Sequence, residues 1–253
     1  MRDELKHLEE VATAAIQGPL YLCCDGSHDP IQHTASHGWV IADSYGNPLW
    51  KGSGPVDGVP SQLNPYRAEI YGLLAVLHLL FRLEHHHNIG NAKAIVYCDN
   101  LKAIKGASNQ SPLNIKQATS DDYDVFLELK SLQNKLQVQT EMTWVKGHYE
   151  GQDQHFKYKL NKVAHKAAVT FLKTPHPDFI PSPIPLLLPT HKVTVSHNNL
   201  ILTTNLRHTI LHELHNNPLK KKLLNDNKWS DKIFNRVHWD AFRLAMSSIS
   251  RSH

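Results

Sequence analysis

Short apolar runs and longer stretches with helical periodicity alternate along the first two thirds of the chain. A continuous apolar run covers 20–24 and ends at Asp25, and shorter runs cover 38–42 and 48–52, on either side of a Ser-Tyr-Gly-Asn turn. Apolar runs of this length, bounded by turn residues, predict strands. The three segments together predict an antiparallel meander.

After residue 65 the hydrophobic period becomes helical. The apolar residues of 65–86 recur at spacings of three and four, behind a proline in the first turn; they are Ile70, Leu73, Leu74, Leu77, Leu80 and Phe81. Runs at 92–98 and 137–145 predict two more strands, and 121–136, 160–172 and a short segment from 101 predict helices. This order of elements predicts an α/β fold with a mixed sheet.

The segment 174–190 interrupts the pattern, because six of its residues are proline. Neither a packed helix nor a central strand can hold proline at that density, so we interpret it as a linker or an extended arm. It separates a main domain, 19–173, from a C-terminal extension, 191–253, and an amphipathic helix is expected over 1–18. The extension predicts two or three helices, whose aromatic residues need an apolar partner on the main domain or elsewhere in a polyprotein: Trp229, Phe234, Trp239 and Phe242.

The composition, with 41% hydrophobic and 20% charged residues, is that of an ordinary globular protein. No apolar stretch reaches the roughly 18 residues that cross a membrane, and the acidic N-terminus does not have the composition of a signal peptide. Cys23, Cys24 and Cys98 lie in apolar runs without zinc-motif spacing. We interpret them as core residues of an intracellular protein in a reducing compartment, cytoplasm or nucleus. Trp39 and Trp144 are likewise expected in the core.

Positive charge is concentrated in the last third of the chain. Residues 176–253 hold 10 Lys and Arg against 5 Asp and Glu, whereas residues 1–175 hold 17 against 18, and the net charge is +4. A basic surface of this kind can bind phosphate groups. The Lys run at 220–222 is equally consistent with a solvated helix face.

Carboxylates follow two of the predicted buried strands. Asp25 follows 20–24 and Asp99 follows 92–98, so parallel pairing of these strands would bring both to one edge of the sheet. Glu69 lies in the first turns of the long helix, directly before its apolar stripe. Asp25 alone is explained by a turn beside Gly26. Three crowded carboxylates, however, repel each other unless a cation lies among them, and oxygen ligands suit Mg²⁺ or Mn²⁺.

Four ordered motifs resemble those of the ribonuclease H family. They are CDGS at 24–27, PYRAEIYGLLAVL at 65–77, YCDN at 97–100, and WVKGH at 144–148 followed by LNKVAHKAA at 160–168. The long interval between the last two is most similar to the domains of retroelement reverse transcriptases. The resemblance covers about 19–172 and implies a five-stranded mixed sheet with flanking helices. It also implies an endonuclease that cuts the RNA strand of RNA–DNA hybrids with two Mg²⁺ or Mn²⁺ ions.

The resemblance implies roles for five side chains at the catalytic centre. Asp25, Glu69 and Asp99 match the first three metal-binding acids, and His148 matches a histidine that assists proton transfer and product release. The fourth acid of the family falls at His165, so we expect His165 to be a metal ligand with a part in catalysis.

Four further positions are expected to contact nucleic acid. Gly26 and Ser27 match residues that touch the RNA near the scissile phosphate, and Lys146 lies in the WVKGH motif. The Asn-rich turn that often precedes Arg-Ala-Glu in the family is reduced here to Asn-Pro-Tyr, so Asn64 is its remaining candidate contact.

Two other functions compete with that of a retrotransposon-type nuclease. A weakened module that binds hybrid or duplex without efficient cleavage is supported by His165 and by the altered turn, and opposed by the retained carboxylates and His148. A transposase or integrase would place a last Glu on a helix after the second Asp, and 159–172 contains none. Glu150 and Asp153 are alternative sources of a fourth carboxylate near the site.

Overall fold

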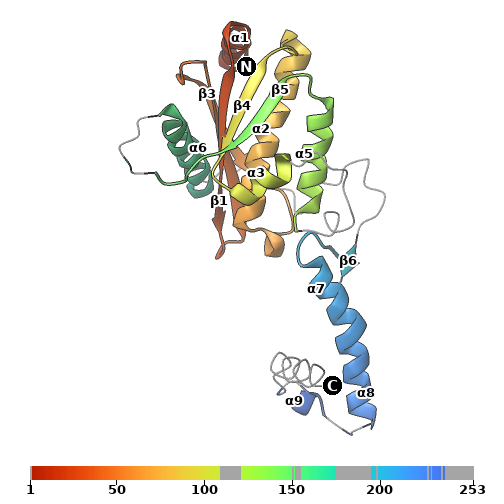
Figure 1. Ribbon diagram of the computed structural model, residues 1–253. Coiled ribbons are helices and arrows are strands. Elements are labelled where there is room, and N and C mark those ends of the chain that lie inside the picture. Colours follow the sequence, from red (N-terminus) through yellow and green to blue (C-terminus); the bar gives the residue numbers. More distant parts are fainter. Residues whose placement is uncertain are drawn as a thin grey trace. The chain divides into compact units, whose positions relative to one another are not determined.

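The computed structural model describes residues 2–108, 121–149, 151, 155–174, 195–197, 199–226, 228, 230–234 and 236 (Figure 1). Contacts between residues divide the chain into two units, 1–204 and 205–253. The first unit contains α1 (Arg2–Gln17), β1 (Leu20–Asp29), β2 (Thr34–Ala42), β3 (Pro48–Pro55), η1 (Pro60–Gln62), α2 (Pro65–His87), β4 (Lys93–Cys98), α3 (Leu101–Ser108), α5 (Tyr123–Lys135), β5 (Gln139–Trp144), α6 (Phe156–Lys173), β6 (Ser196–His197) and β7 (Leu200–Ile201).

Five strands form one mixed sheet in the order β3-β2-β1-β4-β5. The pairs β1–β2 and β2–β3 are antiparallel, which confirms the predicted meander, and β4 is parallel to both β1 and β5. The last parallel pair between β1 and β4 joins Cys24 to Cys98. Asp25 and Asp99 therefore both lie where this parallel pairing ends, as their positions in the sequence predicted.

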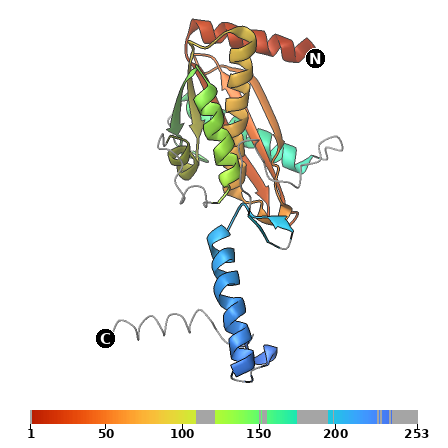
Figure 2. The ribbon, with the colours of Figure 1, turned by 90° about the vertical axis from the view of Figure 1, so that its right-hand side faces the viewer.

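Helices cover the two faces of the sheet unequally (Figures 1 and 2). The larger core joins one face to α1, α2, α3 and α5, and the smaller core joins the other face to α6. Even-numbered residues of β1, such as Leu22, belong to the larger core, and Cys23 belongs to the smaller one. Asp25 has the same parity as Cys23, so β1 presents it on the side of α6.

The helix α2 starts and ends at defined caps. The side chain of Asn64 accepts a hydrogen bond from the Arg67 N–H at 2.8 Å, and Pro65 occupies the first turn. At the other end Asn88 adopts a left-handed conformation with φ 53°. Between the caps, the apolar stripe predicted from the sequence lies in the larger core, where Phe81 is partly buried and the other five residues are buried. These caps fix the position of Glu69 in the second turn.

A buried ion pair joins the start of α2 to the start of α5. The Arg67 guanidinium, 1% exposed, donates to both carboxylate oxygens of Asp124 at 2.8 and 2.7 Å and to Asp122 at 3.1 Å. Its Nε donates to the backbone oxygen of Asp57 at 2.8 Å. Burial alone would lower the pKa of Arg67, but the hydrogen bonds and charges of the two aspartates raise it. The pair holds α5 against the end of α2 that carries Glu69.

The helix α6 lies unusually close to β2. A Cβ on Gly38 would collide with the backbone of Ala164 and Ala168, so only glycine allows this approach. The hydroxyl of Ser36 then donates to the Ala168 oxygen at 2.8 Å. This close packing brings the middle of α6 within reach of β1.

The chain returns to the first unit after the proline-rich segment. Gln62 makes four hydrogen bonds with this returning segment: its Nε2 donates to the Ile201 oxygen, and its Oε1 accepts from the Thr203 N–H, the Thr203 hydroxyl and the Thr204 N–H. The Thr203 oxygen accepts from the Asp122 N–H at 2.7 Å. Residues 195–204 thus belong to the first unit. The predicted linker lies outside the described residues apart from Thr174.

The second unit contains α7 (Leu206–Leu211), η2 (His212–Asn216), α8 (Asn217–Asp226) and α9 (Asp231–Phe234). The helices expected in the extension are present in its described part. Phe234 is 8% exposed, and the Lys220 ammonium lies 5.6 Å from its ring centre. Trp229, Trp239 and Phe242, for which an apolar partner was predicted, lie outside the described residues. Within the described part of the chain, no helix has the length and apolar character needed to cross a membrane.

Candidate active site

Asp25 lies within β1 rather than after it. The strand was expected to end at Cys24, but antiparallel pairing with β2 continues as far as Asp29. Asp25 is 4% exposed; its Oδ1 accepts from the Gly26 N–H at 2.7 Å, and its Oδ2 lies 2.9 Å from Nδ1 of His165. Burial and, secondly, the charge of Asp99 raise the pKa of Asp25 to about 6, although His165 acts in the opposite direction.

Glu69 comes close to Asp25 because β1 approaches α2 at Gly26. A Cβ there would lie 2.6 Å from the backbone of both Ala68 and Glu69, which excludes any other residue. Burial raises the pKa of the Glu69 carboxyl well above its usual range, and the charges of Cys98, Asp25 and Asp99 and a hydrogen bond with Asp25 act in the same direction.

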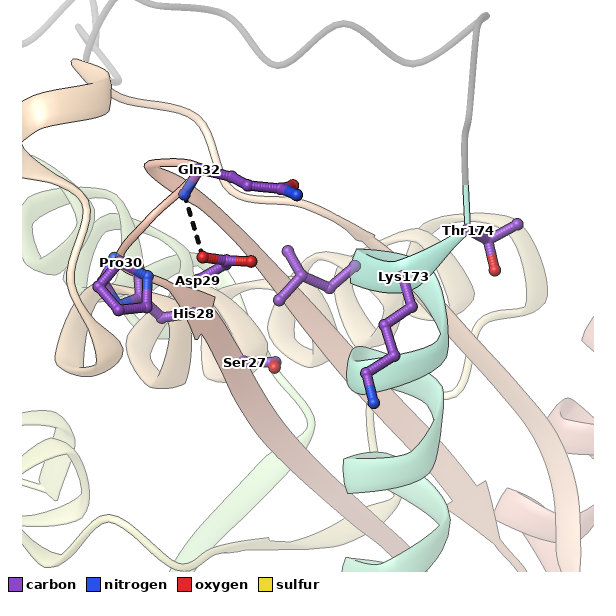
Figure 3. A pocket seen from close by; sticks show the side chains of 8 residues that line it. Ser27, His28, Asp29, Pro30, Gln32, Lys173 and Thr174 are labelled. Carbon is purple, nitrogen blue, oxygen red and sulfur yellow. Dashed lines mark hydrogen bonds between the residues drawn. The ribbon is translucent and has the colours of Figure 1, made fainter.

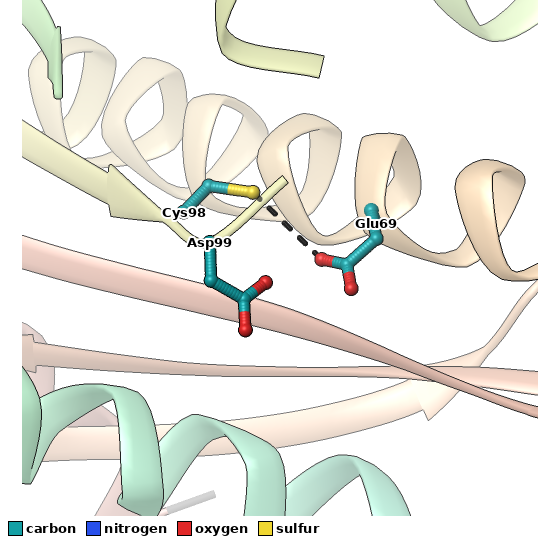
Figure 4. Close-up of side chains that lie close together, drawn as sticks. All are labelled: Glu69, Cys98 and Asp99. Atoms are coloured by element: carbon teal, nitrogen blue, oxygen red, sulfur yellow. Dashed lines mark hydrogen bonds between the residues drawn. The ribbon is translucent and has the colours of Figure 1, made fainter. Parts of the chain in front are cut away.

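Asp99 completes the group of carboxylates. Its Oδ2 lies 3.5 Å from the Asn161 amide of α6, and its backbone oxygen accepts from the Trp144 indole N–H at 2.8 Å. Asp99, Glu69 and Cys98 each offer a ligand atom, and these three atoms lie within 4.8 Å of one another (Figure 4). Three elements that are distant in sequence thus supply carboxylates to one small volume.

Two histidines border this volume on the side of α6. His165 faces Asp25, as its 2.9 Å contact shows, and its side chain is 39% exposed. The ring of His148 meets the ring of His165 edge to face, with 4.9 Å between centres. His148 itself has a left-handed backbone with φ 47°, uncommon for a residue other than glycine. The loop after β5 therefore presents His148 to the site in a constrained conformation.

The donor set fits divalent cations. Asp25, Glu69 and Asp99 bring three carboxyl groups into a largely buried site, where burial and the charges of their neighbours raise the pKa of Asp25 and of Glu69. Carboxylate oxygens are the ligands that Mg²⁺ and Mn²⁺ prefer. His165 could add an imidazole nitrogen, which Mn²⁺ accepts more readily than Mg²⁺ does.

The strand order and the flanking helices together match one known architecture. A mixed sheet in the order β3-β2-β1-β4-β5, in which β2 runs against its neighbours, and helices on both faces form the predicted arrangement. The chain has a ribonuclease H fold. The fold class predicted from the sequence is confirmed.

Solved ribonuclease H domains are among the structures similar to this chain. The N-terminal RNase H domain of rv2228c from Mycobacterium tuberculosis is 15% identical, with a TM-score of 0.43, and the match covers 60% of this chain and 95% of that one. RNase H1 from Halobacterium salinarum is 16% identical, with a TM-score of 0.41 and coverage of 59% and 97%. LC11-RNase H1, solved in complex with an RNA/DNA hybrid, is 13% identical, with a TM-score of 0.43 and coverage of 60% and 99%. No protein-family model and no curated protein matches the sequence.

The four residues expected to contact nucleic acid differ in how accessible they are in the ribonuclease H fold. Gly26 and Ser27 continue β1 beyond Asp25, and Lys146 is exposed, with its ammonium 5.9 Å from the ring centre of Tyr149. Asn64, in contrast, uses its whole amide inside the protein: it caps α2 and donates to the Gln62 oxygen and to Asp122. All four contacts remain predictions.

A pocket of about 710 Å³ opens next to Ser27 (Figure 3). The residues that line it come from the end of β1, the following turn and the end of α6: Ser27, His28, Asp29, Pro30, Gln32, Leu172, Lys173 and Thr174. Within it the Gln32 N–H donates to Asp29 at 3.0 Å. The pocket continues the seam between β1 and α6 outward from Asp25 and His165.

Sequence reasoning missed three side chains of this site. Trp144, expected in the core, is 46% exposed, because its indole N–H reaches across to the Asp99 oxygen. Asn161 was not singled out, although it precedes His165 by one helical turn and so shares its face. Cys98 was correctly expected to be buried, but the contact of its thiol with Glu69 has no signal in the sequence. Trp39, the other tryptophan expected in the core, packs against the larger hydrophobic core. Glu150 and Asp153 lie outside the described residues.

Proposed function

We propose that this chain is a metal-dependent ribonuclease H that hydrolyses the RNA strand of RNA–DNA hybrids, and that it derives from a retrotransposon-type polyprotein. The observation that carries the proposal is that carboxyl groups from three separate elements interact: Glu69 and Asp99 offer ligand atoms within 4.8 Å of each other, and Asp25 interacts with both, with two histidines beside them. A buried acidic group without cations is unfavourable, so its presence is best explained by a function that requires cations.

Each side chain has a defined part in this proposal. Asp25, Glu69 and Asp99 would hold two divalent cations, Mg²⁺ or Mn²⁺, which when bound stabilise the charge that develops on the scissile phosphate. Asn161 and Trp144 orient Asp99 through its carboxylate and its backbone oxygen. His148 lies at the border of the site, where it can accept or donate a proton as product leaves. Gly26 and Ser27 would contact the RNA strand through backbone groups and the hydroxyl.

The test is cleavage of a labelled RNA–DNA hybrid by the purified chain in Mg²⁺ and, separately, in Mn²⁺. Asp25→Asn and Asp99→Asn keep the shape of the site and remove one anionic ligand each, so cleavage should fall at least about a hundredfold. Glu141→Gln is the matched control, because Glu141 is an exposed carboxylate of β5 that pairs with Lys93 at 3.4 Å. Cleavage by both Asn variants at the rate of the parent would show that this site is not catalytic.

One observation favours a second candidate function. The His165 imidazole occupies the vicinity of Asp25 where the family resemblance implies a carboxylate, so cations would be held by less charge. A module of this kind would bind hybrid or duplex without efficient cleavage. Hybrid binding in a gel-shift assay, without cleavage in either metal, would support this candidate over the nuclease.

A further inference from the structure

A thiol lies directly against the proposed metal site. The Cys98 Sγ is 3.7 Å from Oε2 of Glu69 and accepts a hydrogen bond from the Asn100 N–H at 3.4 Å (Figure 4). The Cys98 side chain is fully buried. Its strand position places it one residue before Asp99, so two consecutive residues offer sulfur and oxygen to the same volume.

The three ligand atoms are close enough for one cation. Three atoms no more than 4.8 Å apart share a point at most about 2.8 Å from each (4.8 Å divided by √3), whereas zinc bonds to sulfur and carboxylate oxygen are about 2.3 and 2.0–2.2 Å long. Small adjustments of Glu69 and Asp99 close this difference. Water can occupy a fourth, tetrahedral position.

The sulfur changes which cation the site prefers. Mg²⁺ binds oxygen ligands and rejects thiolates, but Zn²⁺ and Co²⁺ accept a mixed set of one sulfur and several oxygens. The other two cysteines do not offer this combination. Cys24 donates to the Tyr97 backbone oxygen, and Cys23 lies in the smaller core, where it donates to the Asn161 side chain at 3.4 Å.

We propose that Glu69, Cys98 and Asp99 form a binding site for a borderline-soft divalent cation, Zn²⁺, and that Zn²⁺ bound there inhibits the enzyme by displacing the oxygen-ligated ions. Binding costs the Cys98 thiol its proton, which passes to solvent, and forms one metal–sulfur bond. The inhibitory consequence rests on the proposed nuclease function, whereas the binding itself does not.

The binding is tested with Co²⁺, because a cobalt–thiolate bond produces a near-ultraviolet charge-transfer band that the chain's many histidines cannot produce. The full chain is titrated with Co²⁺ under a phosphine reductant, which keeps the three thiols free. The band should reach its maximum at one equivalent in the parent and in the control Cys23→Ser, be absent in Cys98→Ser, and disappear on addition of Zn²⁺. Absence of the band in the parent, or its persistence in Cys98→Ser, would overturn the proposal.

A second variant guards against misfolding of Cys98→Ser. Glu69→Gln leaves the sulfur in place and removes one oxygen ligand, so the band should remain but need at least about tenfold more Co²⁺. An unchanged titration would remove Glu69 from the site and contradict the proposal.

The inhibitory consequence is measured by adding Zn²⁺ to Mg²⁺-supported cleavage of the hybrid. Cys98→Ser should need at least about tenfold more Zn²⁺ for half-inhibition than the parent and Cys23→Ser do. Equal sensitivity of all three proteins would refute inhibition through Cys98. If the parent cuts no hybrid, the proposed function fails, and the cobalt band still decides whether the site exists.

Discussion

The neighbours of Asp25 shift the pKa of its carboxyl group in opposite directions. Burial and the nearby Asp99 favour its neutral form, while the Gly26 N–H and His165 favour its charged form. Burial and Asp99 have the larger effect, so the pKa of Asp25 is raised to about 6. In the unfolded chain the carboxyl returns to a pKa of about 4. A site built this way is unfavourable to folding at neutral pH until a cation neutralises it.

The first prediction at this scale concerns pH and stability. Between about pH 4 and 6 Asp25 binds more protons in the folded protein than in the unfolded chain, so its contribution to the free energy of unfolding should fall as pH rises. Asp25→Asn removes this loss and, in EDTA, should be up to about 3 kcal/mol more stable than the parent at pH 7, since each pKa unit corresponds to about 1.4 kcal/mol. Urea unfolding of both proteins at several pH values measures the difference.

The control for this experiment is Glu141→Gln, whose stability should follow that of the parent at every pH. Added Mg²⁺ should stabilise the parent more than Asp25→Asn. A variant that is less stable than the parent at pH 7 in EDTA would contradict the assignment of Asp25 as an uncompensated buried charge.

The second residue-scale prediction concerns His165. The variant His165→Asp supplies the fourth carboxylate, so cleavage in Mg²⁺ should increase and the advantage of Mn²⁺ over Mg²⁺ should shrink. Cleavage rates of parent and variant across titrations of the two metals test this. Thr170→Asp adds the same charge to an exposed position of α6 and should leave the metal profile unchanged. Identical profiles for the parent and His165→Asp would show that His165 does not influence the cations.

Among the elements, α2 and α5 depend on each other through the Arg67 network. Asp124→Asn removes the carboxylate that accepts from both guanidinium nitrogens of the buried Arg67 and leaves it paired with Asp122, so the free energy of unfolding should fall by about 3 kcal/mol. The exposed pair of Lys93 and Glu141 is the comparison, and Glu141→Gln should cost less than about 1 kcal/mol. Urea denaturation distinguishes the two. Equal losses would mean that burial of the Arg67 pair does not matter.

Hydrophobic periodicity was sufficient to predict most of these elements, because strands and helices bury one face each. It predicted the apolar stripe of α2 and all five strands of the main sheet. It failed where hydrogen bonds of polar residues determine where an element begins or which residues are in contact. The helix α6 begins at Phe156 rather than 160, since His155 accepts from the Lys157 N–H and starts the helix early. The contact between His165 and Asp25 joins residues 140 positions apart, and no local pattern encodes it.

At the scale of the whole molecule, the basic extension beyond residue 204 forms a unit of its own. If its lysines and arginines contact phosphates, a chain ending at Thr204 should bind hybrid more weakly than the full chain, and the logarithm of its affinity should depend less steeply on salt. Affinities measured at several salt concentrations give both slopes. The cut falls after Thr204 because residues 195–204 belong to the first unit through Gln62.

A matched control keeps the extension and neutralises only its lysine run, as Lys220→Gln, Lys221→Gln and Lys222→Gln combined. This variant should have a salt slope between those of the full and shortened chains. Three identical slopes would assign the extension to packing or to protein partners.

The hydrogen bonds of Gln62 also join two parts of the chain that could exist as separate fragments. The segment 195–204 is held by Gln62 and Asp122, not only by the covalent path that leads to it. If one peptide bond within 175–194 were broken, this intramolecular contact would become binding between two polypeptides. One fragment would contribute Gln62 and the other would contribute Thr203. The local concentration supplied by the tether would be lost, and association would depend on how much of each fragment is present. The ribonuclease H-like part and the basic helical part would then behave as exchangeable pieces, each able to be supplied in trans.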